Sequence, residues 1–170
     1  MLGVVLLVAL AVGIYYIRKG MAHGVSAVLY RGTNARAMDE VWTRLSYTAP
    51  GTPAEVQSAV VAALALPTTA PTAFVARTHL ASQSPGRLQI EFGNKMQSQF
   101  AGVATFTAAP DGGTTGAWEV GRWTTHDGVV DSSAVVDAMA AVRTGITDAV
   151  QAAGGDATVR VVPQAERIRR

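Results

Sequence analysis

The stretch from Ala134 to Val150, AVVDAMAAVRTGITDAV, decides the fold of this chain. Its larger apolar side chains recur every three or four residues and so share one face of an α-helix: Val135, Met139, Val142, Ile146 and Val150. In this interpretation Arg143 points to solvent, Asp131 or Ser132 caps the first turn, and Gly154 ends the helix. A helix with one apolar face has to bury that face, so the sequence predicts a sheet packed against it.

A second helix is predicted by the sequence PGTPAEVQSAVVAALAL, which runs from Pro50 to Leu66. Thr52 is expected as the N-cap, with Pro53 at the first helical position and Glu55 placed to bind back to the cap. The residues expected to form its buried stripe are Val56, Val60, Ala63 and Leu64. Pro67 then stops the helix.

Five segments alternate between apolar and polar residues, the pattern of half-buried strands: 41–49, 73–81, 87–94, 97–109 and 117–125. The Gly-rich sequence DGGTTG, from Asp111 to Gly116, is interpreted as a hairpin turn because it lacks the lysine and the strand-to-helix context of a phosphate loop. Trp42 and Trp123 fall on the face opposite the main apolar set of their strands. Such tryptophans more often cover a sheet edge or are partly buried, and in the other cases they mark a contact surface, for which both are candidates.

The first 17 residues, MLGVVLLVALAVGIYYI, carry no charge and are long enough to span a thinned bilayer as a helix. Tyr15 and Tyr16 fit a membrane interface, and Arg18 and Lys19 fit snorkelling anchors. We therefore expect a single-pass membrane protein. Because the basic flank follows the apolar run, we expect the folded domain in the cytoplasm. A cleaved signal peptide, or an apolar helix buried in a partner, is left open as an alternative.

The expected fold class is α+β, with an N-terminal transmembrane helix followed by an antiparallel sheet packed on a long C-terminal helix. The segments are an anchor over 1–20, a juxtamembrane connector over 21–40, one domain over 41–154, and a short strand with a basic tail over 155–170.

This order of elements resembles the START-like superfamily, the helix-grip or SRPBCC proteins related to polyketide cyclases. The resemblance rests on SYTAPGTPAEVQSAVVAAL, on FAGVATFTAAPDGGTTGAWEV and on AVVDAMAAVRTGITDAV, and it covers roughly residues 41 to 154. It implies a curved sheet around the C-terminal helix and a hydrophobic ligand, lipid included, between the two. It transfers no site residue.

Residues with catalytic potential are scattered along the chain. His23, His79 and His126 lie far apart, and the chain has no cysteine, so we expect no metal site and no cofactor. Glu91, Glu119 and Asp127 are candidates for a carboxylate pair, although the alternation of its strand favours a solvated Glu91. No basic stripe with interleaved aromatic residues points to nucleic acid.

Two classes of function remain. The favoured one is a membrane-anchored binding or accessory module that docks on an integral-membrane protein complex or holds a hydrophobic ligand. The alternative is a START-like hydrolase or cyclase acting on an apolar small molecule. Enzymatic activity is left open, with the non-enzymatic class preferred.

Overall fold

The computed structural model describes residues 31–126, 129–130 and 133–167. The chain divides into a unit of Met1–Arg36 and a folded unit of Ala37–Arg170. The predicted membrane segment and its interface residues Tyr15, Tyr16, Arg18 and Lys19 lie outside the described residues. Within the described ranges, no helix is long and apolar enough to cross a bilayer.

Helix α2 (Arg31–Val41) occupies part of the segment that the sequence analysis interpreted as a connector. Ala37 and Val41, one turn apart, are buried at its C-terminal end. Glu40 forms an ion pair with Arg143, whose Nη2 also donates a hydrogen bond of 3.2 Å to Glu40 Oε2. The expectation that Arg143 points freely to solvent is therefore wrong: its side chain is 17% exposed and joins the long helix to α2.

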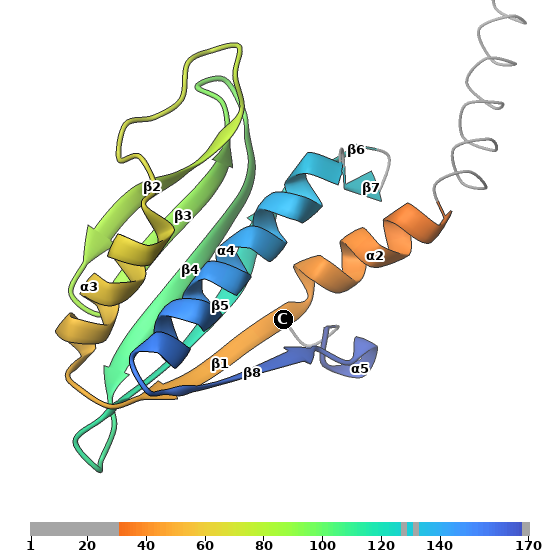
Figure 1. Cartoon of the computed structure of the whole chain (residues 1–170). Helices are drawn as coiled ribbons and strands as arrows, with labels where there is room; N and C mark the ends of the chain where they lie inside the picture. The colour runs from red at the N-terminus through yellow and green to blue at the C-terminus, as the bar shows by residue number, and fades with distance from the viewer. Residues whose placement is uncertain (1–30, 127–128, 131–132, 168–170) are drawn as a thin grey trace, which may run out of the picture. The chain divides into compact units, whose positions relative to one another are not determined.

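The core of the folded unit is a six-stranded antiparallel sheet (Figure 1). Its strands in chain order are β1 (Thr43–Ala49), β2 (Arg77–Ser84), β3 (Arg87–Gly93), β4 (Ser98–Ala108), β5 (Thr114–Trp123) and β8 (Asp156–Val161). In space the order is β2-β3-β4-β5-β1-β8, so the last strand pairs with the first. The folded unit therefore extends past the predicted boundary at residue 154. A two-residue ladder, β6 (Thr125–His126) with β7 (Val129–Val130), and a short helix, α5 (Gln164–Arg167), complete it.

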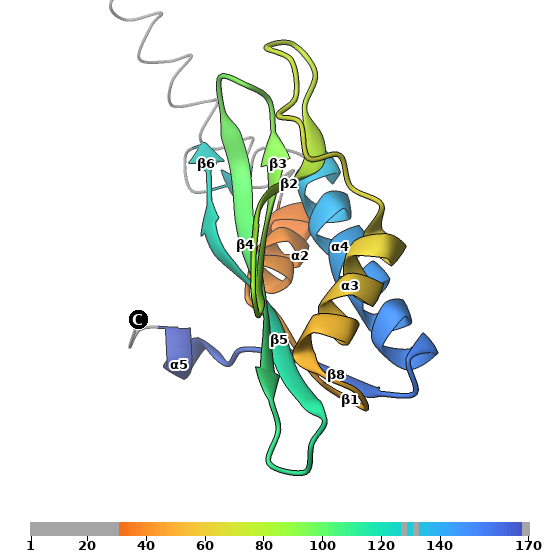
Figure 2. The ribbon, with the colours of Figure 1, turned by 90° about the vertical axis from the view of Figure 1, so that its left-hand side faces the viewer.

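Helices α3 (Pro53–Leu64) and α4 (Ser133–Ala152) cover one face of the sheet, as the edge-on view in Figure 2 shows. All five residues of the predicted stripe on α4 are buried, which confirms the helical period predicted from the sequence. The helix ends at Ala152 and is followed closely by Gly154, whose φ is 80°. The N–H of Gly155 binds Val150 O and that of Gly154 binds Gln151 O, the Schellman arrangement that glycine favours.

Helix α3 begins with the predicted capping box. The Glu55 N–H donates to Thr52 Oγ1, and the Thr52 N–H donates to Glu55 Oε2 at 2.7 Å. The predicted stripe is wrong at Ala63, which is exposed, and it omitted Gln57. This buried amide donates to Ser84 O (2.8 Å) and accepts from the Gly86 N–H (2.9 Å), so it ties α3 to the β2–β3 turn.

The space between the sheet and the helices is filled by side chains. Trp118, Leu45, Met139 and Ile146 are each at most 1% exposed there. The indole of Trp118, on β5, lies directly over Gly102 of the neighbouring strand β4. A Cβ at position 102 would come within 2.1 Å of Trp118 Cη2, so the indole occupies the space that a larger residue would need. The interior of this unit is consequently packed at the point where a START-like domain is expected to hold its ligand.

Candidate functional site: an apolar tip formed by two loops

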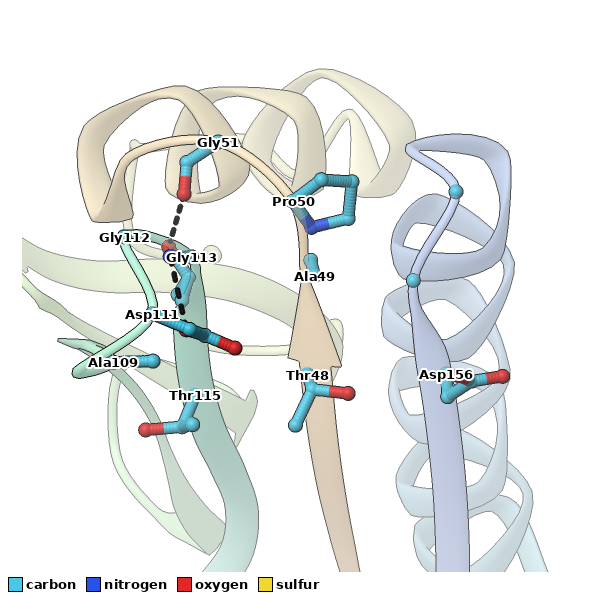
Figure 3. A pocket seen from close by; sticks show the side chains of 13 residues that line it. Thr48, Ala49, Pro50, Gly51, Ala109, Asp111, Gly112, Gly113, Thr115 and Asp156 are labelled. Carbon is cyan, nitrogen blue, oxygen red and sulfur yellow. Dashed lines mark hydrogen bonds between the residues drawn. The ribbon is translucent and has the colours of Figure 1, made fainter.

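A cleft of about 420 Å³ lies at the carboxyl end of β1 (Figure 3). Three connections meet there, around Gly51, the β4–β5 turn, and the glycines that come after α4. Two of the glycines that line the cleft lie so close to the backbone of β1 that no side chain would fit. A Cβ on Gly113 would lie 2.8 Å from Ala49 O, and one on Gly155 would lie 2.3 Å from Thr48 O. The cleft is therefore a consequence of tight turns.

The groups available for chemistry in this cleft are few. Its charged side chains are Asp111 and Asp156, and its hydroxyls belong to threonines. Asp111 Oδ1 accepts the N–H of Gly113 at 3.2 Å, and Thr114 Oγ1 donates to Gly51 O at 2.9 Å, which are turn-stabilising hydrogen bonds. No histidine, lysine or serine is among the lining residues of the cleft.

The carboxylates that were candidates for a catalytic pair are held separately on the face of the sheet that α3 and α4 leave free. Glu119 forms an ion pair with Arg44. Glu91 lies 3.7 Å from Arg122 and accepts a hydrogen bond from Gln89 Nε2 at 2.8 Å. The Glu91 side chain is 17% exposed, so it is less solvated than the strand alternation predicted. Asp127 lies outside the described residues.

Two further groups have acid–base potential, the hydroxyl of Tyr47 and the imidazole of His79. Tyr47 is buried, which raises the pKa of its hydroxyl, and that hydroxyl donates to Thr105 O at 2.7 Å. His79 lies opposite Glu91 in the β2–β3 register. In the described part of the chain, no three His, Asp or Glu residues gather closely enough to hold a metal ion.

The two tryptophans predicted as a contact surface pack against each other. Their ring centroids lie 5.4 Å apart at 74°, and the guanidinium carbon of Arg167 lies 5.4 Å from the Trp42 ring centroid. Both are half-buried against the core. The outward orientation predicted for Trp123 is wrong, because a register shift between Ala101 and Gly102 places Trp123 opposite the buried Phe100.

The most exposed large apolar side chains lie on two loops at one end of the sheet. Phe74 is 93% exposed and Val75 is 59% exposed on the connection from α3 to β2, and Met96 is 81% exposed in the β3–β4 turn. These three residues, with Lys95 beside Met96, are named here the apolar tip. Single exposed apolar residues are ordinary on protein surfaces, but several on neighbouring loops make a candidate contact site.

Hydrogen bonds join the two loops of the apolar tip into one structure. The Lys95 N–H donates to Thr72 O at 3.2 Å, across the gap between them. Asn94 Oδ1 accepts the N–H groups of Met96 and Gln97, both at 2.9 Å, which holds the β3–β4 turn and directs Met96 outward. The exposure of these side chains is thus built into a hydrogen-bonded turn.

The sequence analysis missed the apolar tip because it assigned Phe74 and Val75 to a strand over 73–81. The strand begins at Arg77, and the residues before it make a loop. Pro67 and Pro71 were the available signal, since each restricts the residue that precedes it and together they favour a longer loop.

The strand registers place the apolar tip at the end of the sheet where the chain joins this unit. Arg77 pairs with Gly93 and Phe100 with Trp123, at the ends of strands nearest the tip. Trp42, immediately after α2, accepts the N–H of Val162 at this same end of β1. The glycine-lined cleft lies at the opposite end. Both projecting loops are visible at the top of Figures 1 and 2.

Comparisons of this chain with family models, with curated proteins and with solved structures found no match. A function for this chain therefore has to be inferred from the geometry of its described residues.

Proposed function

We propose that this protein is a single-pass membrane-anchored accessory module that docks on an integral-membrane protein complex through its outer surface. The observation that carries the proposal is the filled space between the sheet and α4, together with the exposed apolar side chains of Val159 and Val161 on the edge strand β8. A domain that holds a hydrophobic ligand would need the opposite arrangement, an apolar cavity of several hundred Å³.

The surface hollows support docking over ligand storage. Hollows of about 420, 580 and 30 Å³ lie outside the core, and none of the three is lined by a residue of α4. The START-like resemblance stays a prediction. In this proposal the chain shares the layered arrangement of a sheet on a long helix while its interior holds no ligand.

The membrane anchor in this proposal is the apolar run from Met1 to Ile17, with Arg18 and Lys19 directly after it. An uncharged run of this length, ending in tyrosines and basic residues, favours a retained span over a cleaved signal. The basic flank favours a cytoplasmic location for the folded unit.

Purification of the full-length chain from membranes in mild detergent tests the proposal. We expect a membrane protein partner in near-equal amount by mass spectrometry, and no lipid or other small apolar molecule retained in near-equal amount by native mass spectrometry. A small molecule bound one to one, without a protein partner, would contradict docking and favour a ligand-holding or enzymatic role.

A further inference from the structure

We propose that the apolar tip enters the interfacial layer of an anionic lipid bilayer. The proposal rests on the membrane anchorage proposed above, and it assigns to the folded unit a second, direct contact with the lipid surface. Three observations support a bilayer as the occupant: the chemistry of the tip, the basic side chains on or beside its two loops, and the place where the chain joins the unit.

The chemistry of the tip matches the boundary between head groups and acyl chains. An aromatic residue, a branched aliphatic residue and a methionine, exposed by 93%, 59% and 81%, can enter the acyl region while the loop backbone stays among the head groups. The β3–β4 turn holds part of its backbone by hydrogen bonds of its own, from the N–H groups of Met96 and Gln97 to Asn94 Oδ1, and the Lys95 N–H joins it to Thr72 O of the other loop.

The two loops of the tip carry basic charge. Lys95 and the exposed Arg77 lie on or beside the two loops, and neither loop contains an acidic residue. Basic groups near a membrane are attracted to anionic head groups, so these two side chains favour contact of the tip with an anionic lipid surface.

The position of the N-terminal segment in the sequence gives the tip access to the bilayer. The chain joins the unit at Ala37, at the tip's end of the sheet, and residues 18–36 separate it from the apolar run. Residues 31–36 belong to α2 and add about 9 Å, and the thirteen residues 18–30 reach at most about 45 Å when extended. A tether of this length keeps the tip at a high effective concentration near the leaflet.

The experiment uses the full-length chain with a single cysteine carrying an environment-sensitive fluorophore, which is straightforward because the sequence contains no cysteine. Phe74→Cys places the label on the tip. The matched control, Thr115→Cys, places it at an exposed strand position near the cleft. Both proteins are reconstituted into vesicles of phosphatidylcholine and phosphatidylserine that contain a lipid-borne quencher, and each sample is also floated on a density gradient after a carbonate wash.

We expect several-fold stronger quenching at position 74 than at position 115, and weaker quenching at position 74 when Lys95→Gln is added or phosphatidylserine is omitted. Equal, weak quenching at the two positions in protein that floats would overturn the bilayer contact and favour a protein surface as the occupant of the tip, while leaving the anchor intact. Quenching at position 74 in protein that carbonate removes would support the tip and contradict the integral anchor. Protein that never associates with the vesicles would overturn both.

Discussion

Replacing Ile146 by alanine tests the central packing of the unit, that of α4 on the sheet. Ile146 is 0% exposed and lies in the middle of the stripe that contacts the strands. The substitution removes three buried carbon atoms, worth about 0.8 kcal/mol each in transfer free energy, or about 2.4 kcal/mol together. The cavity that remains adds to this, so the free energy of unfolding should fall by about 3 to 4 kcal/mol.

For a unit of this size, each kcal/mol corresponds to about 3 to 4 °C in Tm, so we expect the Tm to fall by about 10 to 15 °C. Thermal unfolding of the full-length chain in mild detergent, monitored by near-ultraviolet circular dichroism, measures the shift. Thr144→Ala, at an exposed position of the same helix, is the matched control and should change stability by less than about 0.5 kcal/mol. Small and equal shifts in both variants would refute the packing of α4 on the sheet.

Three further predictions concern single contacts. The hydrogen bonds from Thr52 lower the pKa of Glu55, so the contribution of this carboxylate to stability is present above the ordinary carboxyl pKa and is lost as pH falls through the lowered value. The Tm difference between wild type and Glu55→Gln should therefore shrink as the pH is lowered from 7 through that lowered pKa. Gly102→Ala should lower stability by about 2 kcal/mol or more in urea unfolding because its Cβ would overlap an indole, whereas Gly121→Ala, with its nearest atom 4.0 Å away, should be tolerated. Arg143→Ala should cost about 1 to 3 kcal/mol by the same assay because it leaves a half-buried Glu40 unpaired, and a cost no greater than that of Thr144→Ala would contradict this role.

Local patterns in the sequence were sufficient for the elements whose signals lie within a few residues of one another. The capping box at Thr52 and Glu55 forms from residues three apart, and the structure confirms it. The stripe of α4 and the glycine that ends this helix are likewise confirmed, since the helical period and the left-handed C-terminal turn depend on neighbouring residues. The α+β class and the antiparallel sheet come from the same kind of information.

Interactions between distant segments decided the features that the sequence analysis missed. The direction of Trp123 depends on a register shift between β4 and β5, and a single extra residue moves every subsequent side chain to the other face. Arg143 pairs with Glu40, which is 103 residues away in the sequence. Strand β8 pairs with β1, at the other end of the folded unit's sequence, and this pairing depends on the position of α4, which precedes β8.

The candidate site depends on both kinds of information. Sequence alone determined that Phe74, Val75 and Met96 are apolar and that no acidic residue accompanies them on their loops. Only the tertiary structure decided that these side chains stay outside the core, because the core volume is already filled by residues such as Trp118 and Ile146. Which apolar residues are buried depends on how all of them pack together in one interior, so burial cannot be deduced from any local pattern.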